Sequence, residues 1–192
     1  KIYFSNGFYD FEKGEFMKND FETLITIDRE FNPVSNKEIR SQIYKKVFNP
    51  LFSIDEDSKT DINQKQRKQL LNYVLHKISR VFAGHIEDKD WFMFYGNRDC
   101  GKGLLGDFLK NCFHNYVDTT NSGNFIYKVN NGDSAKNLSF LTRFIYKRLI
   151  MINEVPKDMN KNKVVFDGTT IKKFCSGGDY IEARTNHKDE IT

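Results

Sequence analysis

Residues 96–104 have the spacing of a loop that binds nucleotide phosphates. The pattern of such loops is Gly, four residues, Gly-Lys and then Ser or Thr. Gly96, Gly101 and Lys102 match it, and Gly103 stands where a hydroxyl is usual. Uncovered backbone N–H groups can surround phosphate oxygens, and the lysine reaches the terminal phosphates. A turn without a ligand is the alternative. The predicted nucleotide-binding residues are Gly96, Asn97, Arg98, Asp99, Cys100, Gly101, Lys102, Gly103 and Leu104.

An acidic residue follows the apolar run Leu149–Ile152. Asn153 and Glu154 stand at its end, before Pro156. In nucleotide hydrolases a strand beside the phosphate loop delivers an acid for magnesium and often one that polarises water. We therefore predict Glu154 as general base, and Asn153 with Glu154 as ligands of Mg²⁺. An ordinary solvated carboxylate after a core strand is an equal alternative.

A basic segment with a glycine turn lies near the end of the chain. A flexible turn flanked by cations can follow a phosphodiester backbone, so we predict contact with nucleic acid. A solvated charged face is the alternative, and Asp179 could instead brace the turn through backbone hydrogen bonds. The predicted DNA-binding residues are Lys172, Lys173, Gly177, Gly178, Asp179, Arg184 and Lys188.

The elements around the glycine loop would place it at the start of a helix. Residues 91–95, Trp-Phe-Met-Phe-Tyr, are typical of a strand buried on both faces. After Lys102, apolar residues recur at helical spacing through residue 112. The expected order is strand, loop, helix, which suits phosphates because a helix N-terminus offers free N–H groups and a positive dipole end.

Further elements are predicted from periodicity, caps and turn residues. They are a hairpin of two short strands at Asn6-Gly7, a helix over 36–48 capped by Ser35 or Asn36, a loop over 53–66, an amphipathic helix with apolar residues from 70 to 82 that ends near Gly84, a helix over 135–147 capped by Ser134, a strand over 149–152, a helix over 167–175, and a turn and strand over 177–184.

Composition limits the class of protein. The 192 residues are 39% hydrophobic, enough for one substantial core. A net charge of +4 is compatible with nucleic acid as a partner without requiring it. The three cysteines are too widely and irregularly spaced for a disulfide framework or a zinc site. No run approaches the roughly 18 apolar residues that cross a bilayer, so we expect an intracellular, soluble protein and no membrane partner.

Three ordered stretches together resemble the superfamily 3 helicases, in the poxvirus-type primase-helicase branch of large DNA viruses, phages and plasmids. "GNRDCGKG" is similar to the phosphate loop of that family, and "RLIMINE" to its second nucleotide motif. "IKKFCSGGDYIEAR" is similar to the third motif, which is peculiar to the superfamily. "FSNGFYDFEKGEF" resembles the opening of the region that precedes the helicase.

The resemblance implies an α/β fold with a P-loop, AAA+-like ATPase core. Residues 85–192 would be that core, incomplete at its C-terminal end, and residues 1–84 a small strand-and-helix region before it. It also implies ATP and Mg²⁺ as cofactors, a ring that is usually a hexamer, and movement on single-stranded or forked DNA during viral or mobile-element genome replication, with a primase as a possible domain or partner. The location would be host cytoplasm or a viral replication site.

Residue roles also follow from the resemblance. Lys102 would hold the β and γ phosphates, Glu154 would activate water, and residues 172–184 would couple the nucleotide site to DNA. Gly103 and Asn153 depart from the commoner pattern, and Thr192 precedes the positions where this family places its sensor and its arginine finger. We therefore expect this segment alone to be weakly active or inactive. The alternatives are an ATPase for protein remodelling or DNA packaging, and an inactive scaffold of the same fold.

Overall fold

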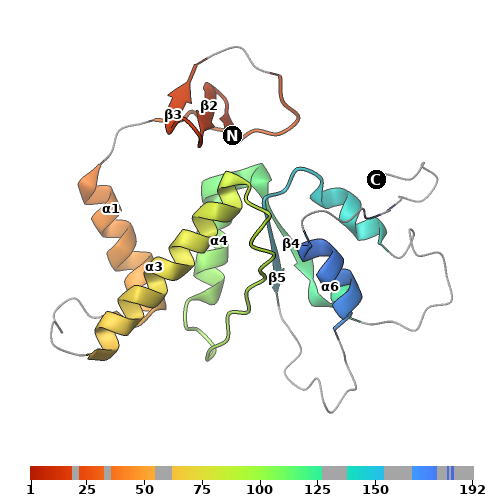
Figure 1. Cartoon of the computed structure of the whole chain (residues 1–192). Coiled ribbons are helices and arrows are strands. Elements are labelled where there is room, and N and C mark those ends of the chain that lie inside the picture. Colours follow the sequence, from red (N-terminus) through yellow and green to blue (C-terminus); the bar gives the residue numbers. More distant parts are fainter. Residues whose placement is uncertain are drawn as a thin grey trace. The chain divides into compact units, whose positions relative to one another are not determined.

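The computed structural model contains helices, an antiparallel sheet and a small parallel sheet, so the chain has a mixed α/β structure (Figure 1). The chain divides into two compact units, the first formed by residues 1–84 and 93–116 and the second by residues 85–92 and 117–192. The structure describes residues 1–18, 22–32, 36–54, 62–126, 138–153 and 166–176, together with Ile181 and Ala183.

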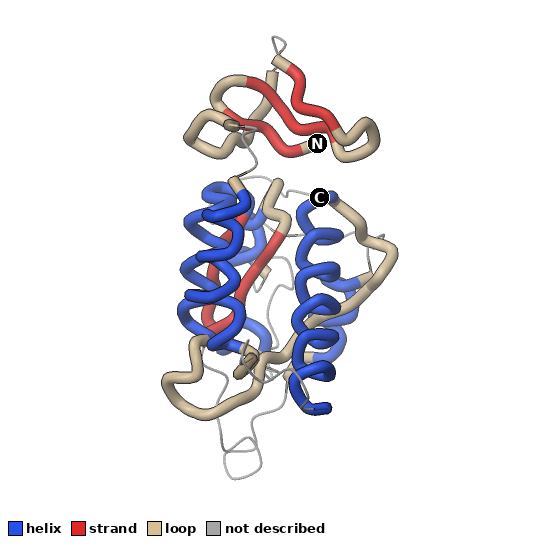
Figure 2. The backbone as a smooth tube through the Cα atoms, turned by 90° about the vertical axis from the view of Figure 1, so that its left-hand side faces the viewer, coloured by secondary structure: helices blue, strands red, loops and turns tan. Residues whose placement is uncertain are grey.

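The first unit begins with three antiparallel strands in the order β1-β2-β3, seen beside the N-terminus in Figure 2. They are β1 (Ile2–Phe4), β2 (Gly7–Asp10) and β3 (Glu15–Met17). The predicted hairpin is confirmed, although the turn is Ser5-Asn6 and Gly7 opens β2. Gly7 has φ 152°, and an added Cβ would lie 2.3 Å from the carbonyl oxygen of Met17. Only glycine fits there.

Two polar residues tie the segment before the first helix to the end of a later one. The guanidinium of Arg29 donates to the carbonyl oxygen of Cys112 at 2.6 Å, near the C-terminus of α4 (Lys102–Phe113). The amide of Asn115 donates to the carbonyl oxygen of Thr26 at 3.0 Å. A cation at a helix C-terminus meets the negative end of the helix dipole, so Arg29 stabilises the helix that carries the glycine loop.

The other regular elements that the structure describes in the first unit are helices. α1 (Lys37–Ile43) is capped by Asn36, whose side chain accepts from the N–H groups of Glu38 and Ile39, as predicted. It continues as a π-helical turn over Tyr44–Phe48 and as α2 (Asn49–Leu51).

The longest helix is α3 (Ile62–Ala83), which ends at Gly84 as predicted. It begins earlier than expected, because residues 62–66 are helical instead of part of a loop. Leu71, Val74 and Phe82 are buried, and the Phe82 ring stacks on Phe113 of α4 with centroids 3.5 Å apart. These three residues of the predicted apolar face are therefore packed, whereas Leu70, at the start of that face, is 53% exposed.

The second unit contains a parallel pair of strands, β4 (Val117–Asn121) and β5 (Leu149–Asn153). Val117 pairs with Leu149, and the register runs level to Asn121 opposite Asn153. β5 was predicted as a buried strand and is half-buried; β4 was not predicted. α6 (Gly168–Cys175) confirms the helix expected over 167–175.

The core of the second unit gathers around Leu141, Phe144 and Ala183. Leu141 and Phe144 belong to a 3₁₀ helix over Ser139–Phe144, where an α-helix was predicted over 135–147. The predicted cap Ser134 lies outside the described residues. Further apolar side chains packed on this core are Leu138, Phe140, Ile150, Phe174 and Ile181.

The prediction of a buried strand over residues 91–95 is wrong. These residues form no strand, and their side chains are exposed, Tyr95 to 98%. A strand forms only when its N–H and C=O groups find a partner strand, and no described strand pairs with this segment. An apolar run has the composition of a buried strand, but it does not indicate which other strand would pair with it.

The length and composition of the helices test the expectation that no segment crosses a membrane. Among those that the structure describes, none has both the length and the apolar character required to cross a bilayer.

Candidate nucleotide-binding loop and strand ends

The glycine loop leads directly into α4 through a left-handed residue. Gly101 is the N-cap, with φ 86°, and its carbonyl oxygen accepts from the N–H of Leu105 at 3.1 Å. Asp99 also has positive φ, 59°, and Cys100 between them does not. Alternation of left-handed and ordinary residues turns successive N–H groups toward one side, which creates a concavity that binds anions. The loop therefore has the backbone character that phosphate binding requires.

Lys102 lies folded over this loop. Its Nζ donates to the carbonyl oxygens of Gly96 and Asn97 at 3.0 and 2.7 Å, and it contacts Cys100 Sγ at 3.0 Å. A lysine ammonium has three N–H donors, so the loop itself takes all of them. The side chain predicted to bind phosphate thus sits at the loop, and its charge is directed inward.

Contact with Lys102 changes the ionisation of Cys100. The hydrogen bond from the Lys102 side chain stabilises the thiolate and lowers the pKa of Cys100 below its usual range. Gly96 makes room for this sulfur, since a Cβ at Gly96 would lie 3.0 Å from Cys100 Sγ. The other two cysteines behave oppositely, because burial raises the pKa of Cys112 and of Cys175.

The remaining loop residues lie in solvent. Arg98 and Asp99 form an ion pair with Nε and Oδ2 3.6 Å apart, and both side chains are at least nine-tenths exposed. Such a pair adds little stability and leaves both side chains free to rearrange. A Cβ at Gly103 would have no atom within 4 Å, so steric crowding does not explain the missing hydroxyl. Leu104 is half exposed, and Leu105 and Leu109 anchor α4 in the core.

The second predicted site is described only in part. β5 ends at Asn153, level with Asn121 of β4, and Glu154 lies outside the described residues. Ligands of α/β proteins commonly bind beyond the carboxyl ends of parallel strands. In the described ranges, no group of three or more His, Cys, Asp or Glu side chains could hold a metal ion. The Mg²⁺ ligands Asn153 and Glu154 therefore stay a prediction.

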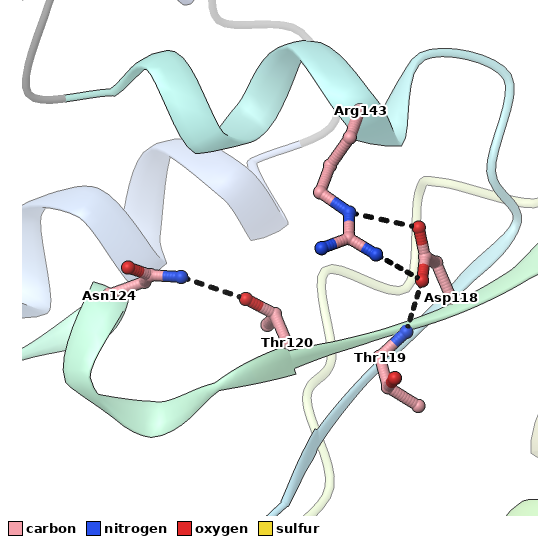
Figure 3. A network of polar contacts seen from close by, with 5 residues as sticks. All are labelled: Asp118, Thr119, Thr120, Asn124 and Arg143. Carbon is pink, nitrogen blue, oxygen red and sulfur yellow. Dashed lines mark hydrogen bonds and ion pairs between the residues drawn. The ribbon is translucent and has the colours of Figure 1, made fainter.

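A polar network that sequence patterns did not indicate surrounds β4 (Figure 3). Arg143 donates through Nε and Nη2 to the two oxygens of Asp118, at 3.2 and 2.9 Å. Partial burial opposes ionisation of Asp118, but the N–H of Thr119 and the Arg143 guanidinium outweigh it and lower the pKa of this carboxyl. The two partners are 25 residues apart, so no local motif could reveal the pair.

Two other polar side chains lie near the end of β4. The Asn124 amide donates to Thr120 Oγ1 at 3.0 Å (Figure 3). The Asn121 side chain accepts from the N–H of Gly123 at 2.7 Å and so caps the 3₁₀ turn Ser122–Phe125. These bonds fix the turn that follows the strand end.

The predicted DNA-binding residues are also described in part. Lys172 and Lys173 are exposed in the last turn of α6. Asp167 caps this helix by accepting from the hydroxyl and N–H of Thr170 and from the N–H of Thr169, which lowers its pKa. The other predicted DNA-binding residues lie outside the described ranges, namely Gly177, Gly178, Asp179, Arg184 and Lys188.

Comparison with known proteins gives one relative along the full chain. No protein-family model and no solved structure matches. The chain is 27% identical, over 195 residues and its whole length, to "Putative helicase V13" of Sputnik virophage, and it spans 22% of that protein. The sequence is therefore similar throughout to one part of a viral protein described as a helicase.

Proposed function

We propose that this chain is the nucleotide-binding part of an ATP-dependent DNA helicase of superfamily 3. The observation that carries the proposal is the loop over residues 96–101. It combines alternating left-handed residues, the N-terminus of α4 and the Lys102 ammonium in one short segment. The similarity to a virophage protein described as a helicase supports the same function. Genome replication of a virus or mobile element is the setting that we propose with it.

ATP binding would require Lys102 to change partners. In the structure its ammonium is bonded to the Gly96 and Asn97 carbonyls. A triphosphate offers anionic oxygens, which form stronger charge-assisted hydrogen bonds than neutral carbonyls do. The ammonium would therefore turn from the loop to the β and γ phosphates, while the loop N–H groups and the positive end of α4 receive the remaining oxygens.

Mg²⁺ would be held without a loop hydroxyl. Because Gly103 supplies none, the ion would depend on phosphate oxygens, water, Asn153 and Glu154. Glu154 would also polarise the attacking water. An inactive scaffold is the competing function, and the absence of a hydroxyl at Gly103 is the observation that favours it.

DNA would bind through the segment around α6. Lys172 and Lys173 supply exposed positive charge there, and the Gly177-Gly178-Asp179 turn follows in sequence. We propose residues 85–192 as the ATPase core, residues 1–84 as the region before it, and a hexameric ring of the longer protein as the working form.

The experiment is ATP titration of the longer protein that contains this chain, with and without single-stranded DNA. Lys102→Ala should abolish ATP binding, because it removes the only lysine of the loop. Lys110→Ala is the matched control, since Lys110 is exposed on the same helix and lies outside the predicted site. DNA should raise ATP turnover in the wild type. ATP binding that survives Lys102→Ala unchanged would refute the site, and turnover indifferent to DNA would favour a remodelling ATPase.

A further inference from the structure

Cys100 occupies a special place beside the phosphate-binding lysine. Its sulfur lies 3.0 Å from Lys102 Nζ, and the two loop carbonyls take the other N–H donors of that ammonium. The remaining charged residues of the loop, Arg98 and Asp99, pair with one another in solvent. In the loop, Cys100 is therefore the side chain that meets the Lys102 charge.

We propose that Cys100 is a positioning residue for Lys102, which it holds inward over the loop and for which it competes with the phosphates of a nucleotide. The proposal rests on the proposed function, because the competitor is the bound nucleotide. According to this proposal, the loop contains one residue that weakens ATP binding as well as residues that strengthen it.

The competition follows from charge. An ionised sulfur and a phosphate are both anions, and one ammonium cannot be in close contact with both without bringing like charges together. The Lys102 ammonium lies 3.0 Å from the sulfur and favours its ionised form, which lowers the pKa of Cys100. When phosphate takes Lys102, the thiolate loses its partner and acquires an anionic neighbour. ATP binding should therefore disfavour ionisation of Cys100, and ionisation of Cys100 should weaken ATP binding by the same factor, as linked equilibria require.

Two variants separate this role from simple packing. Cys100→Ala removes the sulfur, and Cys100→Ser keeps the size and a hydrogen-bond acceptor but does not ionise. If the sulfur competes for Lys102, both variants should bind ATP roughly two- to fivefold more tightly at a pH where the wild-type thiol is ionised, which is the range of one exposed charge pair. If Cys100 only fills space, Cys100→Ser should bind as the wild type does, and this result would overturn the proposal.

Thiol labelling tests the contact without relying on nucleotide binding. Iodoacetamide labelling of the longer protein, read by mass spectrometry, should modify Cys100 faster than the partly buried Cys112 and Cys175. Lys102→Met should slow labelling of Cys100 severalfold, and Lys110→Met should not. Equal rates in wild type and Lys102→Met would overturn the proposed contact.

ATP links the two experiments. ATP should slow labelling of Cys100 in the wild type, and adenosine, which lacks phosphates, should not. Three results then have distinct meanings. Lys102-dependent ATP binding with unchanged affinity in Cys100→Ala refutes the competition and leaves the proposed function standing. Absence of any ATP binding refutes the proposed function. Protection by ATP with tighter binding in both Cys100 variants supports both.

Discussion

The hydroxyl of Tyr116 accepts a hydrogen bond from the backbone N–H of Tyr3 at 3.1 Å, across 113 positions of sequence. The same hydroxyl donates to the carbonyl oxygen of Ile25 at 3.3 Å, and Tyr116 is 2% exposed. The Tyr116 hydroxyl therefore links the residues just after α4 to the N-terminal sheet. This contact anchors α4 near its C-terminus, the end opposite the glycine loop.

Tyr116→Phe should reduce the free energy of unfolding by about 1–3 kcal/mol, because it leaves the Tyr3 N–H and the Ile25 carbonyl oxygen without this partner. Urea denaturation followed by circular dichroism would measure the loss. Tyr95→Phe is the matched control, since Tyr95 is 98% exposed. Equal effects of the two substitutions would contradict the anchoring role.

Gly101 and Gly103, on either side of Lys102, should respond to substitution by alanine with changes in stability of opposite sign. Gly101→Ala should destabilise the chain by roughly 1–2 kcal/mol, because φ 86° is unfavourable for a residue with a Cβ. Gly103→Ala should stabilise it by about 0.5–1 kcal/mol, because its position is helical and a Cβ there meets no atom. Thermal melting of both variants gives the comparison, and a stabilising Gly101→Ala would disprove the left-handed cap.

The Asp118 carboxyl should give stability a dependence on pH. Its pKa in the folded chain is lowered from the ordinary 3.8, so its stabilising effect is present above that value and is lost as pH falls through the folded pKa. At pH 7, Asp118→Asn should lower the free energy of unfolding by about 1 kcal/mol.

Below pH 3.8 the gap between wild type and Asp118→Asn should shrink. Urea titrations at several pH values would measure it. Asp107→Asn, on the exposed side of α4, serves as control. A gap that stays constant into acid would argue against the ion pair with Arg143.

The exposed lysines of α6 should contribute to DNA binding through charge. Replacing Lys172 and Lys173 by Gln should weaken binding of single-stranded DNA at low salt. It should also reduce the slope of log K against log salt by about 0.7 for each phosphate that is no longer neutralised by a lysine. Fluorescence anisotropy at several salt concentrations measures both, with Lys110→Gln as control. An unchanged slope of log K against log salt would show that Lys172 and Lys173 do not contact the DNA phosphates.

Most helices were predicted well because their signals are local, although residues 139–144 form a 3₁₀ helix where an α-helix was expected over 135–147. Asn36 caps α1 three residues from the N–H of Ile39, and Asp167 caps α6 in the same way. The helix after Lys102 likewise follows from its own apolar spacing. Each of these depends on neighbours within one turn, and sequence spacing displays such neighbours directly.

Strands and long-range contacts were predicted poorly because their partners are distant in sequence. β4 reads Val-Asp-Thr-Thr-Asn, too polar to resemble a core strand, and it forms by pairing with β5 about 30 residues later. Residues 91–95 show the opposite case, with strand-like composition and no described partner. The interaction of Cys100 with Lys102 was also missed, since the motif specifies the lysine and leaves the residue two places before it open.

The bare backbone at Gly96 has an evolutionary consequence. A Cβ there would lie 3.0 Å from Cys100 Sγ, so the sulfur would have to shift from the position in which it contacts Lys102. Positions 96 and 100 should therefore covary: in homologues that retain glycine at both 96 and 101, cysteine is tolerated at 100, and wherever 96 becomes larger, a smaller residue should replace the thiol.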